Sequence, residues 1–189
     1  MLKPDSIVRS LVGKIFQRFE EQGLKLVAAR MIKATEKQVS KHYPYKDKKW
    51  SEGIGKKSLE NFGGDIKRLK EAYGTDNFEE IGHIVYRAMK GYLISAPVII
   101  NVWEGNHAVK RVRHLVGSTV PTFAEVGSIR GSFAFDTPVL AVKSGRITFK
   151  NLIHASDSVE EAEREIRIWF GSKYKDLSNY ERVDYVDIL

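Results

Sequence analysis

Asn151-Leu152-Ile153-His154-Ala155-Ser156-Asp157-Ser158 is the most informative segment of this chain. An apolar pair leads to a histidine, and small and hydroxyl residues separate that histidine from a predicted helix starting near Val159. Ser158 and Glu161 have the spacing of a capping box, in which each side chain pairs with a backbone N–H of the first turn. His154 therefore lies just before a helix N-terminus, where backbone amides and the helix dipole favour negative charge.

Imidazole is a good nucleophile near neutral pH, because much of it is unprotonated there. A histidine beside an anion-favouring helix start therefore suggests transfer of a phosphoryl group. Such transfer depends on positioning and on charge stabilisation, and cations elsewhere in the chain fit it. Arg130 lies beside a glycine that lets the backbone approach a ligand, and Arg113 precedes a hydroxyl-bearing turn at residues 117–119. One such cation alone is typical of a solvated surface, whereas Lys3, Arg113 and Arg130 together with His154 favour a phosphate site.

The composition is that of a globular protein with anionic partners. The 189 residues are 42% hydrophobic and 29% charged, which is enough for one domain with a well-buried core. The net charge of +7 favours nucleotides, nucleic acid or acidic lipid without choosing among them. Cysteine is absent, which excludes disulfides and thiolate metal sites, and no apolar run approaches the length of a membrane span. We therefore expect a cytoplasmic protein with no membrane partner.

Interleaved helix and strand patterns predict an α+β fold. This order fits a ferredoxin-like sandwich, in which helices cover an antiparallel four-stranded sheet. Because that fold hosts many functions, the function must be argued from the site. Helices are expected near residues 11–22, 36–42, 57–71, 78–93, 106–115 and 158–170, and strands at 24–33, 97–103 and 133–135.

Several blocks together resemble the nucleoside diphosphate kinases, and the resemblance covers nearly all of the chain. Lys3-Pro4-Asp5-Ser6 is similar to the family's opening Lys-Pro-Asp-Gly. The resemblance implies one domain over residues 1–189, with insertions at about 45–75 and 136–150. The most specific blocks are Val102-Trp103-Glu104-Gly105, Gly127-Ser128-Ile129-Arg130-Gly131 and the segment around His154.

The resemblance implies a role for each matching residue. His154 would take the γ-phosphoryl group of an NTP as a phosphohistidine and pass it to an NDP, in a ping-pong reaction with Mg²⁺ carried by the nucleotide. Ser156 and Glu165 would orient the histidine ring, with Tyr43 nearby and Lys3 as a catalytic cation. No protein metal ligand is expected. The nucleobase would lie in a shallow cleft that does not discriminate between bases. The assembly would be a homo-oligomer, either a hexamer or a tetramer. The nucleotide-binding positions would be Lys3, Val85, Met89, Arg113, Thr119, Arg130 and Asn151.

The sequence also departs from the family pattern. The family stacks the base on a phenylalanine, whereas the matching helix offers Val85 and Met89, and the family's Arg-Gly-Asp-Phe becomes Arg-Gly-Ser-Phe at residues 130–133. The first insertion is expected to be a mobile, solvated flap near the nucleotide cleft, or equally a decoration at a subunit interface. The family's apolar strand before Lys-Pro-Asp is represented by Met1 and Leu2. Lys3 is therefore expected near a fraying terminus, unless the polypeptide starts upstream.

Two further interpretations remain open at this point. An RNA-binding ferredoxin-like module would use the positive charge and the tyrosines, although an RRM would carry an aromatic run on a strand that this sequence lacks. A catalytically inactive scaffold of the same fold is the other alternative. An assay of phosphoryl transfer from ATP to an NDP distinguishes all three.

Overall fold

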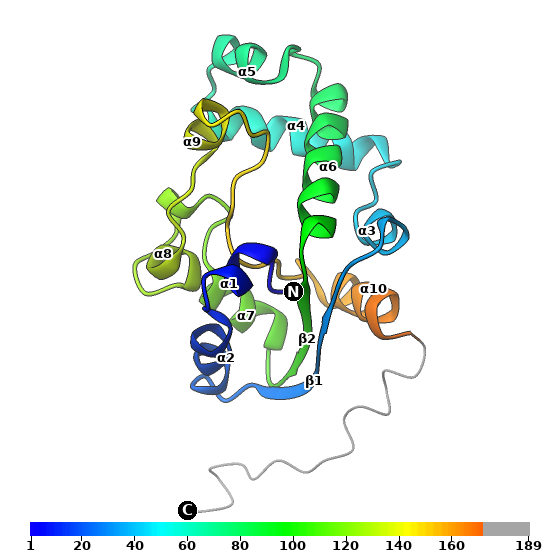
Figure 1. Ribbon diagram of the computed structural model, residues 1–189, viewed down its shortest axis with the longest axis vertical. Coiled ribbons are helices and arrows are strands. Elements are labelled where there is room, and N and C mark those ends of the chain that lie inside the picture. The colour runs from blue at the N-terminus through cyan, green and yellow to red at the C-terminus, as the bar shows by residue number, and fades with distance from the viewer. Residues whose placement is uncertain (172–189) are drawn as a thin grey trace, which may run out of the picture.

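Figure 1 shows the computed structural model, in which the structure describes residues 1–171. A small sheet lies between two groups of helices, and a third group of helices lies at one end of a long central helix (Figure 1). In chain order the elements are α1 (Pro4–Val8), α2 (Val12–Glu20), β1 (Lys25–Ile32), α3 (Glu36–His42), α4 (Lys48–Asn61), α5 (Ile66–Tyr73), α6 (Phe78–Ser95), β2 (Val98–Glu104), α7 (Ala108–Val116), the 3₁₀ helix η1 (Pro121–Phe123), α8 (Ile129–Phe133), α9 (Pro138–Lys143) and α10 (Val159–Phe170).

Two antiparallel strands form the sheet. β1 and β2 pair from Lys25 opposite Glu104 to Ile32 opposite Val98. Pro97 lies just before β2, where its missing N–H removes no ladder bond. The run of valine and isoleucine that opens β2 suits a strand, because β-branched side chains pack well on a pleated surface.

The first residues of the chain extend this sheet. Leu2 bridges Ile99 of β2 on one side and Ile153 on the other. The Leu2 N–H donates to the carbonyl of Ile99 at 2.7 Å, and the Lys3 N–H donates to the carbonyl of Leu152 at 2.8 Å. Among residues 1–171 the backbone order is therefore β1, β2, Leu2, Ile153, with two strands and two single bridges where four full strands were expected. The prediction that Lys3 lies in a fraying terminus is wrong, because Leu2 beside it is buried and paired on both edges.

Alternation along β2 divides the core into two layers. Val98 and Ile100 are buried on one face and Ile99 on the other, because successive side chains of a strand point to opposite faces. Ile99 packs with Phe19 of α2 and with apolar residues of α7 and α8. Val98 and Ile100 pack with Trp169 of α10 and with apolar residues of α3 and α6. The two helix groups lie on opposite sides of the sheet in Figure 1.

The first insertion folds as two packed helices, α4 and α5, and its expected mobility and its place at the nucleotide cleft or at a subunit interface stay predictions. Residues 63–64 are glycines with positive φ, and they turn the chain between the two helices within the predicted helix 57–71. α4 crosses α6 very closely. A Cβ atom on Gly55 would clash with the carbonyl of Phe78, and one on Gly82 would clash with the carbonyl of Ser51. Glycine is therefore required on both helices at this crossing.

The two insertions share one core. Phe62 and Leu69 of the first insertion are buried against Ile81 of α6, and Val142 of α9 in the second insertion packs on the same cluster. Figure 1 shows α4, α5 and α9 grouped around the same end of α6. The second insertion, in which the sequence predicted no helix or strand, thus contributes a helix to this end of the molecule.

The carboxylate of Asp136 connects the two ends of the second insertion. Arg146 donates two hydrogen bonds to Asp136, at 2.5 and 3.0 Å, and the Lys150 N–H donates a third at 2.8 Å. Burial alone would raise the pKa of Asp136, but the hydrogen bonds from Arg146 and from the backbone hold that pKa below its usual value. The segment from residue 136 to residue 150 is therefore fixed at both ends.

The predicted strand at residues 133–135 is wrong. Ser128 accepts a hydrogen bond from the Gly131 N–H at 3.1 Å, and this cap begins the short helix α8, which ends at Phe133. Within residues 1–171, no helix is both long and apolar enough to cross a membrane. A single domain over residues 1–189 stays a prediction, and its part from residue 172 onward lies outside the described residues.

Candidate active site

A strained backbone turn places the segment around His154. Leu152 has a φ of 69°, a left-handed conformation that is unfavourable for a side chain with a Cβ atom. Asp5 accepts a hydrogen bond from the Leu152 N–H at 3.0 Å, and Ser6 donates one to the Leu152 carbonyl at 2.5 Å. Asp5 also accepts a bond from the Tyr92 hydroxyl at 2.5 Å, which ties α1 to α6. The Lys-Pro-Asp block therefore holds the turn on which His154 is presented.

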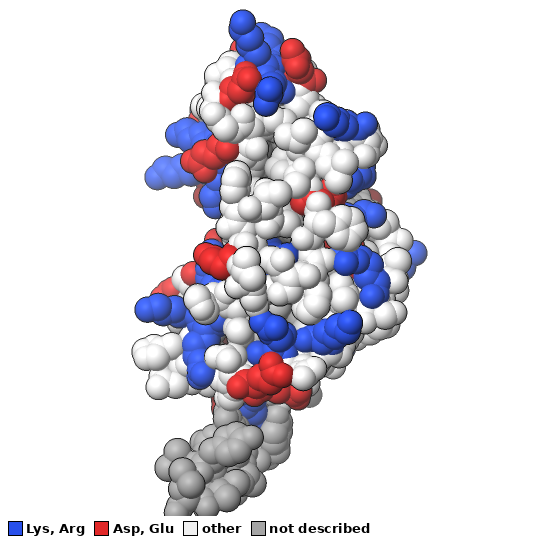
Figure 2. Space-filling model, turned by 90° about the vertical axis from the view of Figure 1, so that its left-hand side faces the viewer, with Lys and Arg blue, Asp and Glu red and all other residues white. Residues whose placement is uncertain are grey.

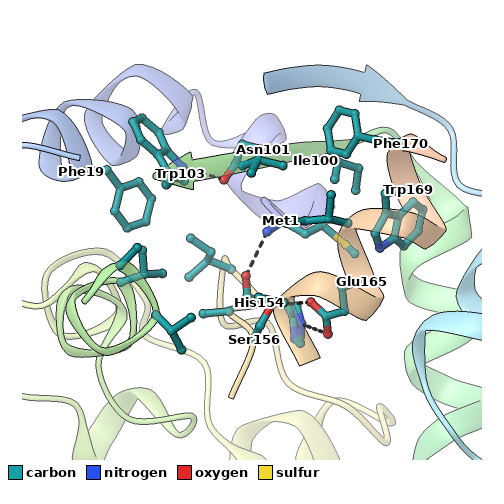
Figure 3. A pocket seen from close by; sticks show the side chains of 18 of the residues that line it. Met1, Phe19, Ile100, Asn101, Trp103, His154, Ser156, Glu165, Trp169 and Phe170 are labelled. Carbon is teal, nitrogen blue, oxygen red and sulfur yellow. Dashed lines mark hydrogen bonds and ion pairs between the residues drawn. The ribbon is translucent and has the colours of Figure 1, made fainter. Parts of the chain in front are cut away.

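Glu165 links His154 to Ser156 (Figure 3). Its Oε1 lies 2.8 Å from Nε2 of His154, and its Oε2 accepts a hydrogen bond from the Ser156 hydroxyl at 2.7 Å. Ser158 caps α10 by accepting a bond from the Glu161 N–H, and this fixes the start of the helix that carries Glu165. Half of the expected capping box is present, because Glu161 pairs with Arg164 through its side chain. The three side chains predicted to act together thus lie in one hydrogen-bonded group.

These contacts fix which nitrogen of His154 is free. A neutral imidazole carries one proton, and the nitrogen facing a carboxylate is the one that donates. Burial lowers the pKa of His154 well below 6.5, with further lowering from the amino group of Met1, Lys3 and Arg130. His154 is therefore neutral near pH 7, with the proton on Nε2 and a lone pair on Nδ1. Figure 3 shows the ring at the wall of a pocket of about 110 Å³.

Lys3, Asn151 and Thr119 form a second group. The Lys3 ammonium donates to Oδ1 of Asn151 at 2.6 Å, and the Asn151 amide donates to the carbonyl of Thr119 at 2.9 Å. Burial lowers the pKa of Lys3 to about 8, with a further contribution from Arg130. The structure thus brings three of the expected nucleotide-binding residues together beside the histidine segment.

Arg130 is buried and supports the same segment. Its guanidinium donates to the carbonyls of Asn151, Gly117 and Ile153 at 3.2, 2.8 and 2.6 Å. A guanidinium has five N–H donors, so two remain for a ligand. Burial lowers the pKa of Arg130 to about 10, with a further contribution from Arg113, and the side chain stays charged at neutral pH.

Arg113 lies on α7 at the surface and pairs with Asp157. Both side chains are largely exposed, so phosphate can replace the carboxylate at small cost. Tyr43 follows α3 directly, and its ring centroid lies 6.3 Å from that of His154. Burial raises the pKa of Tyr43, and Glu165 raises it further, so the hydroxyl keeps its proton and can donate.

Val85 and Met89 lie on α6 and are not in the hydrogen-bonded groups described above. Val85 packs on the cluster that contains Phe62 and Leu69 of the first insertion. Met89 lies one turn further along α6 and is half-buried. Their contact with a nucleobase stays a prediction.

Two further residues lie at the site that the sequence did not indicate, His42 and Trp169. The ring centroid of His42 lies 4.6 Å from that of His154, and the Trp169 indole donates to Nδ1 of His42 at 3.3 Å. The signals were the position of His42 beside Tyr43 and the spacing of Trp169, one helical turn after Glu165. These two residues matter because they are buried beside His154 and Glu165. A single histidine in a sequence does not reveal that it will be buried there.

Three of these side chains could in principle hold a metal ion. Donor atoms of His42, His154 and Glu165 come within 4.8 Å of one another. They are already hydrogen-bonded, however, and Lys3 and Arg130 place positive charge nearby. We therefore interpret this trio as a hydrogen-bonded group.

Comparison with known proteins agrees with this geometry. A family profile described as "Nucleoside diphosphate kinase" matches residues 1–54 and 64–174. A nucleoside diphosphate kinase of Pyrobaculum aerophilum is 46% identical over 172 residues, which cover 90% of this chain and 92% of that protein. The chain belongs to the nucleoside diphosphate kinase family, and it is a phosphotransferase.

Solved structures show the same relationship. The crystal structure of an NDP kinase from Pyrobaculum aerophilum superposes with a TM-score of 0.82 at 42% identity, covering 92% of this chain and 94% of that one. The nucleoside-diphosphate kinase of Borrelia burgdorferi, solved as a transition state mimic with bound vanadate and ADP, gives a TM-score of 0.72 at 32% identity. That match covers 98% of this chain and 92% of that one.

Proposed function

We propose that this nucleoside diphosphate kinase works through a phosphohistidine on Nδ1 of His154. The lone pair of Nδ1 attacks the γ-phosphorus of a nucleoside triphosphate. The bond from that phosphorus to the β–γ bridging oxygen breaks, and the nucleoside diphosphate leaves with the electron pair. A terminal oxygen of a second nucleoside diphosphate then attacks the phosphorus and breaks the N–P bond. The free histidine is restored, as a ping-pong reaction requires.

The hydrogen bond from His154 to Glu165 carries the proposal. As Nδ1 bonds to phosphorus, the ring becomes positively charged, and the adjacent carboxylate stabilises that charge without any movement. Ser156 holds the other carboxylate oxygen and so keeps Glu165 in place. Nε2 retains its proton throughout, and so no general base is needed for the attack.

The phosphates lie, in this proposal, among Lys3, Arg113, Arg130 and the Tyr43 hydroxyl. The first three are cations and the fourth is a donor, which suits a group whose charge is spread over several oxygens. Asn151 and Thr119 contact the ribose or phosphate, and Val85 and Met89 line a cleft that does not discriminate between bases. Mg²⁺ enters as part of the nucleotide substrate, because the carboxylates close to these side chains, Asp5, Glu165 and Asp157, are already paired.

The proposal extends to the organisation of the protein. We infer one nucleoside diphosphate kinase-like domain over residues 1–189, decorated by the two insertions at residues 45–75 and 136–150. We also propose a homo-oligomer, a hexamer or a tetramer, and a cytoplasmic location. Mass measurement in solution and localisation of a tagged chain test these two points.

Labelling with γ-³²P ATP tests the nucleophile. The wild-type protein should acquire a label that is lost in acid and stable in base, as a phosphohistidine is. His154→Ala should abolish the label, whereas His114→Ala, on the surface of α7, should leave it unchanged. A label that persists in His154→Ala overturns the assignment, and a wild-type protein without label supports the inactive scaffold.

The structure gives no support to the RNA-binding alternative. Trp103 is the one aromatic residue of β2, and its partly buried ring packs against Phe16 and Phe19, so the strand lacks the aromatic run of an RRM. On the face shown in Figure 2, basic side chains are interspersed with acidic and uncharged ones. The family assignment and the site therefore favour nucleotides as the anionic partners.

A further inference from the structure

His42 lies beneath the nucleophile. It is the last residue of α3 and is 1% exposed. Its ring centroid is 4.6 Å from that of His154, and the two rings are nearly perpendicular, at 78°. Its Nδ1 lies 3.6 Å from Oε1 of Glu165, the oxygen that accepts the bond from His154. His42 is thus the neighbour of both partners in the central hydrogen bond of the site.

The proton position on His42 follows from Trp169. An indole N–H is a donor and never an acceptor, so Nδ1 of His42 must hold a lone pair toward it. The proton of His42 is then on Nε2, which is buried and has no hydrogen-bond partner among the described residues. An unpaired buried N–H disfavours folding, so an apolar ring of the same shape would serve a purely structural role better.

Burial, together with the surrounding charges, keeps His42 neutral. Burial lowers its pKa well below 6.5, and His154, the amino group of Met1 and Arg164 lower it further, against the opposing effect of Glu165. A protonated His42 would present an Nδ1–H 3.6 Å from the Oε1 atom that His154 uses. A neutral His42 leaves that oxygen to His154.

Trp169 is a second potential competitor for the same oxygen. Its N–H reaches Nδ1 of His42, which is adjacent to Oε1 of Glu165. Without an acceptor at residue 42, the indole N–H would be left unpaired and buried, with Oε1 of Glu165 3.6 Å from the place that Nδ1 of His42 now occupies. A buried donor without a partner is strongly driven to find one.

We propose that His42 is a positioning residue for phosphoryl transfer: by accepting the Trp169 N–H, it leaves Glu165 to orient the ring of His154. This inference rests on the proposed function of His154. His42 does not touch the phosphoryl group, and it acts through Glu165. Nothing in its role requires a change in nucleotide binding.

The test is a double-mutant cycle on residues 42 and 169. His42→Phe keeps the ring and removes the acceptor, and the rate of His154 labelling by γ-³²P ATP should fall about tenfold while KM for the nucleotide stays within about twofold. Trp169→Phe removes the competing donor and should change the labelling rate little. The double variant should label several times faster than His42→Phe, because no donor then competes for Glu165. A structural role predicts the opposite, since two core substitutions disturb packing more than one.

Two controls complete the experiment. His42→Asn places an amide oxygen near the position of Nδ1 and should label within about threefold of wild type. Val39→Ala, also buried in α3, should lower thermal stability without slowing the labelling of folded protein. Wild-type labelling in His42→Phe, or no recovery in the double variant, overturns the inference. If His42→Phe does not fold, a tenfold loss in His42→Asn overturns it, and labelling within threefold supports it. Failure of the wild type to label would instead refute the proposed function.

Discussion

The carboxylate of Glu165 lies 2.8 Å from Nε2 of His154, on the side of the ring opposite the nitrogen that is free to attack. This single contact sets the tautomer of the nucleophile and supplies the charge that balances the phosphorylated ring. It also makes the site sensitive to changes that alter the carboxylate without altering the fold.

Replacement of Glu165 by glutamine should slow the reaction more than it weakens binding. The amide keeps the shape but not the charge, so kcat should fall about 10- to 100-fold, with KM nearly unchanged. Steady-state kinetics with ATP and an NDP provide the measurement. Glu161→Gln, on the same helix and paired with Arg164, is the matched control. Equal losses in the two variants would contradict the role of Glu165.

The pH dependence of labelling follows from the lowered pKa of His154. The nucleophile is the neutral ring, so the labelling rate should be flat from neutral pH down to about 6.5, the ordinary histidine value, and fall only below it. The unfolded chain binds protons first in that range, so the contribution of this histidine to stability is complete above 6.5 and is lost as the pH falls. Quenched-flow labelling at fixed nucleotide concentration gives the profile. A midpoint above 6.5 would count against the buried neutral ring.

The lowered pKa of Lys3 predicts a separate effect on nucleotide binding at alkaline pH. Its pKa is lowered to about 8, so the ammonium loses its charge as the pH rises through that value. KM for the nucleotide should then rise between pH 7 and pH 9. In Lys3→Arg the charge persists, because a guanidinium is not deprotonated in this range, and KM should be flatter. An equally steep rise in both proteins would assign the effect to another group.

Asp157 should compete with the nucleotide for Arg113. Asp157→Asn removes the carboxylate that occupies the guanidinium and should lower KM for an NDP about two- to threefold, with kcat unchanged. Glu163→Gln changes the net charge equally on α10, the helix that follows Asp157, and Glu163 pairs with Arg167. The competition is disproved if both variants shift KM by the same factor.

The crossing of α4 and α6 gives a prediction for stability. Gly82→Ala should destabilise the protein by about 1–3 kcal/mol, because the added methyl group meets the Ser51 carbonyl of α4. Gly91→Ala, in the same helix and with open space around it, should stabilise by about 0.5–1 kcal/mol. Urea unfolding measures both. A neutral Gly82→Ala would show that the first insertion does not pack tightly in solution.

The sequence predicted local features well. The helix predicted near residues 11–22 is α2, which buries Ile15 and Phe19, and the prediction that Ser158 caps the helix after it is confirmed. The resemblance to the family selected His154, Ser156 and Glu165, which the structure brings into one group. These successes depend on short spacings or on blocks of sequence that stay together.

Features that depend on distant contacts were missed. Phe62 and Val142 share a core although they lie in separate insertions, and nothing local in either segment indicates the other. The strand expected at residues 133–135 failed because the cap at Ser128 was overlooked. His42 was missed because its importance comes from its contact with His154, which lies 112 positions later in the chain.

The backbone conformation of Leu152 links formation of the active site to the order in which the chain is translated. Its left-handed backbone costs about 1 kcal/mol, and the bonds that offset that cost come from Asp5 and Ser6, which are translated well before Leu152. Asp5 and Ser6 must wait for a partner that is translated much later, and Glu165 follows later still. A nascent chain interrupted before α10 therefore has the histidine but lacks Glu165, the carboxylate that orients its ring. Phosphate incorporation would thus mark translation completed through the last described helix.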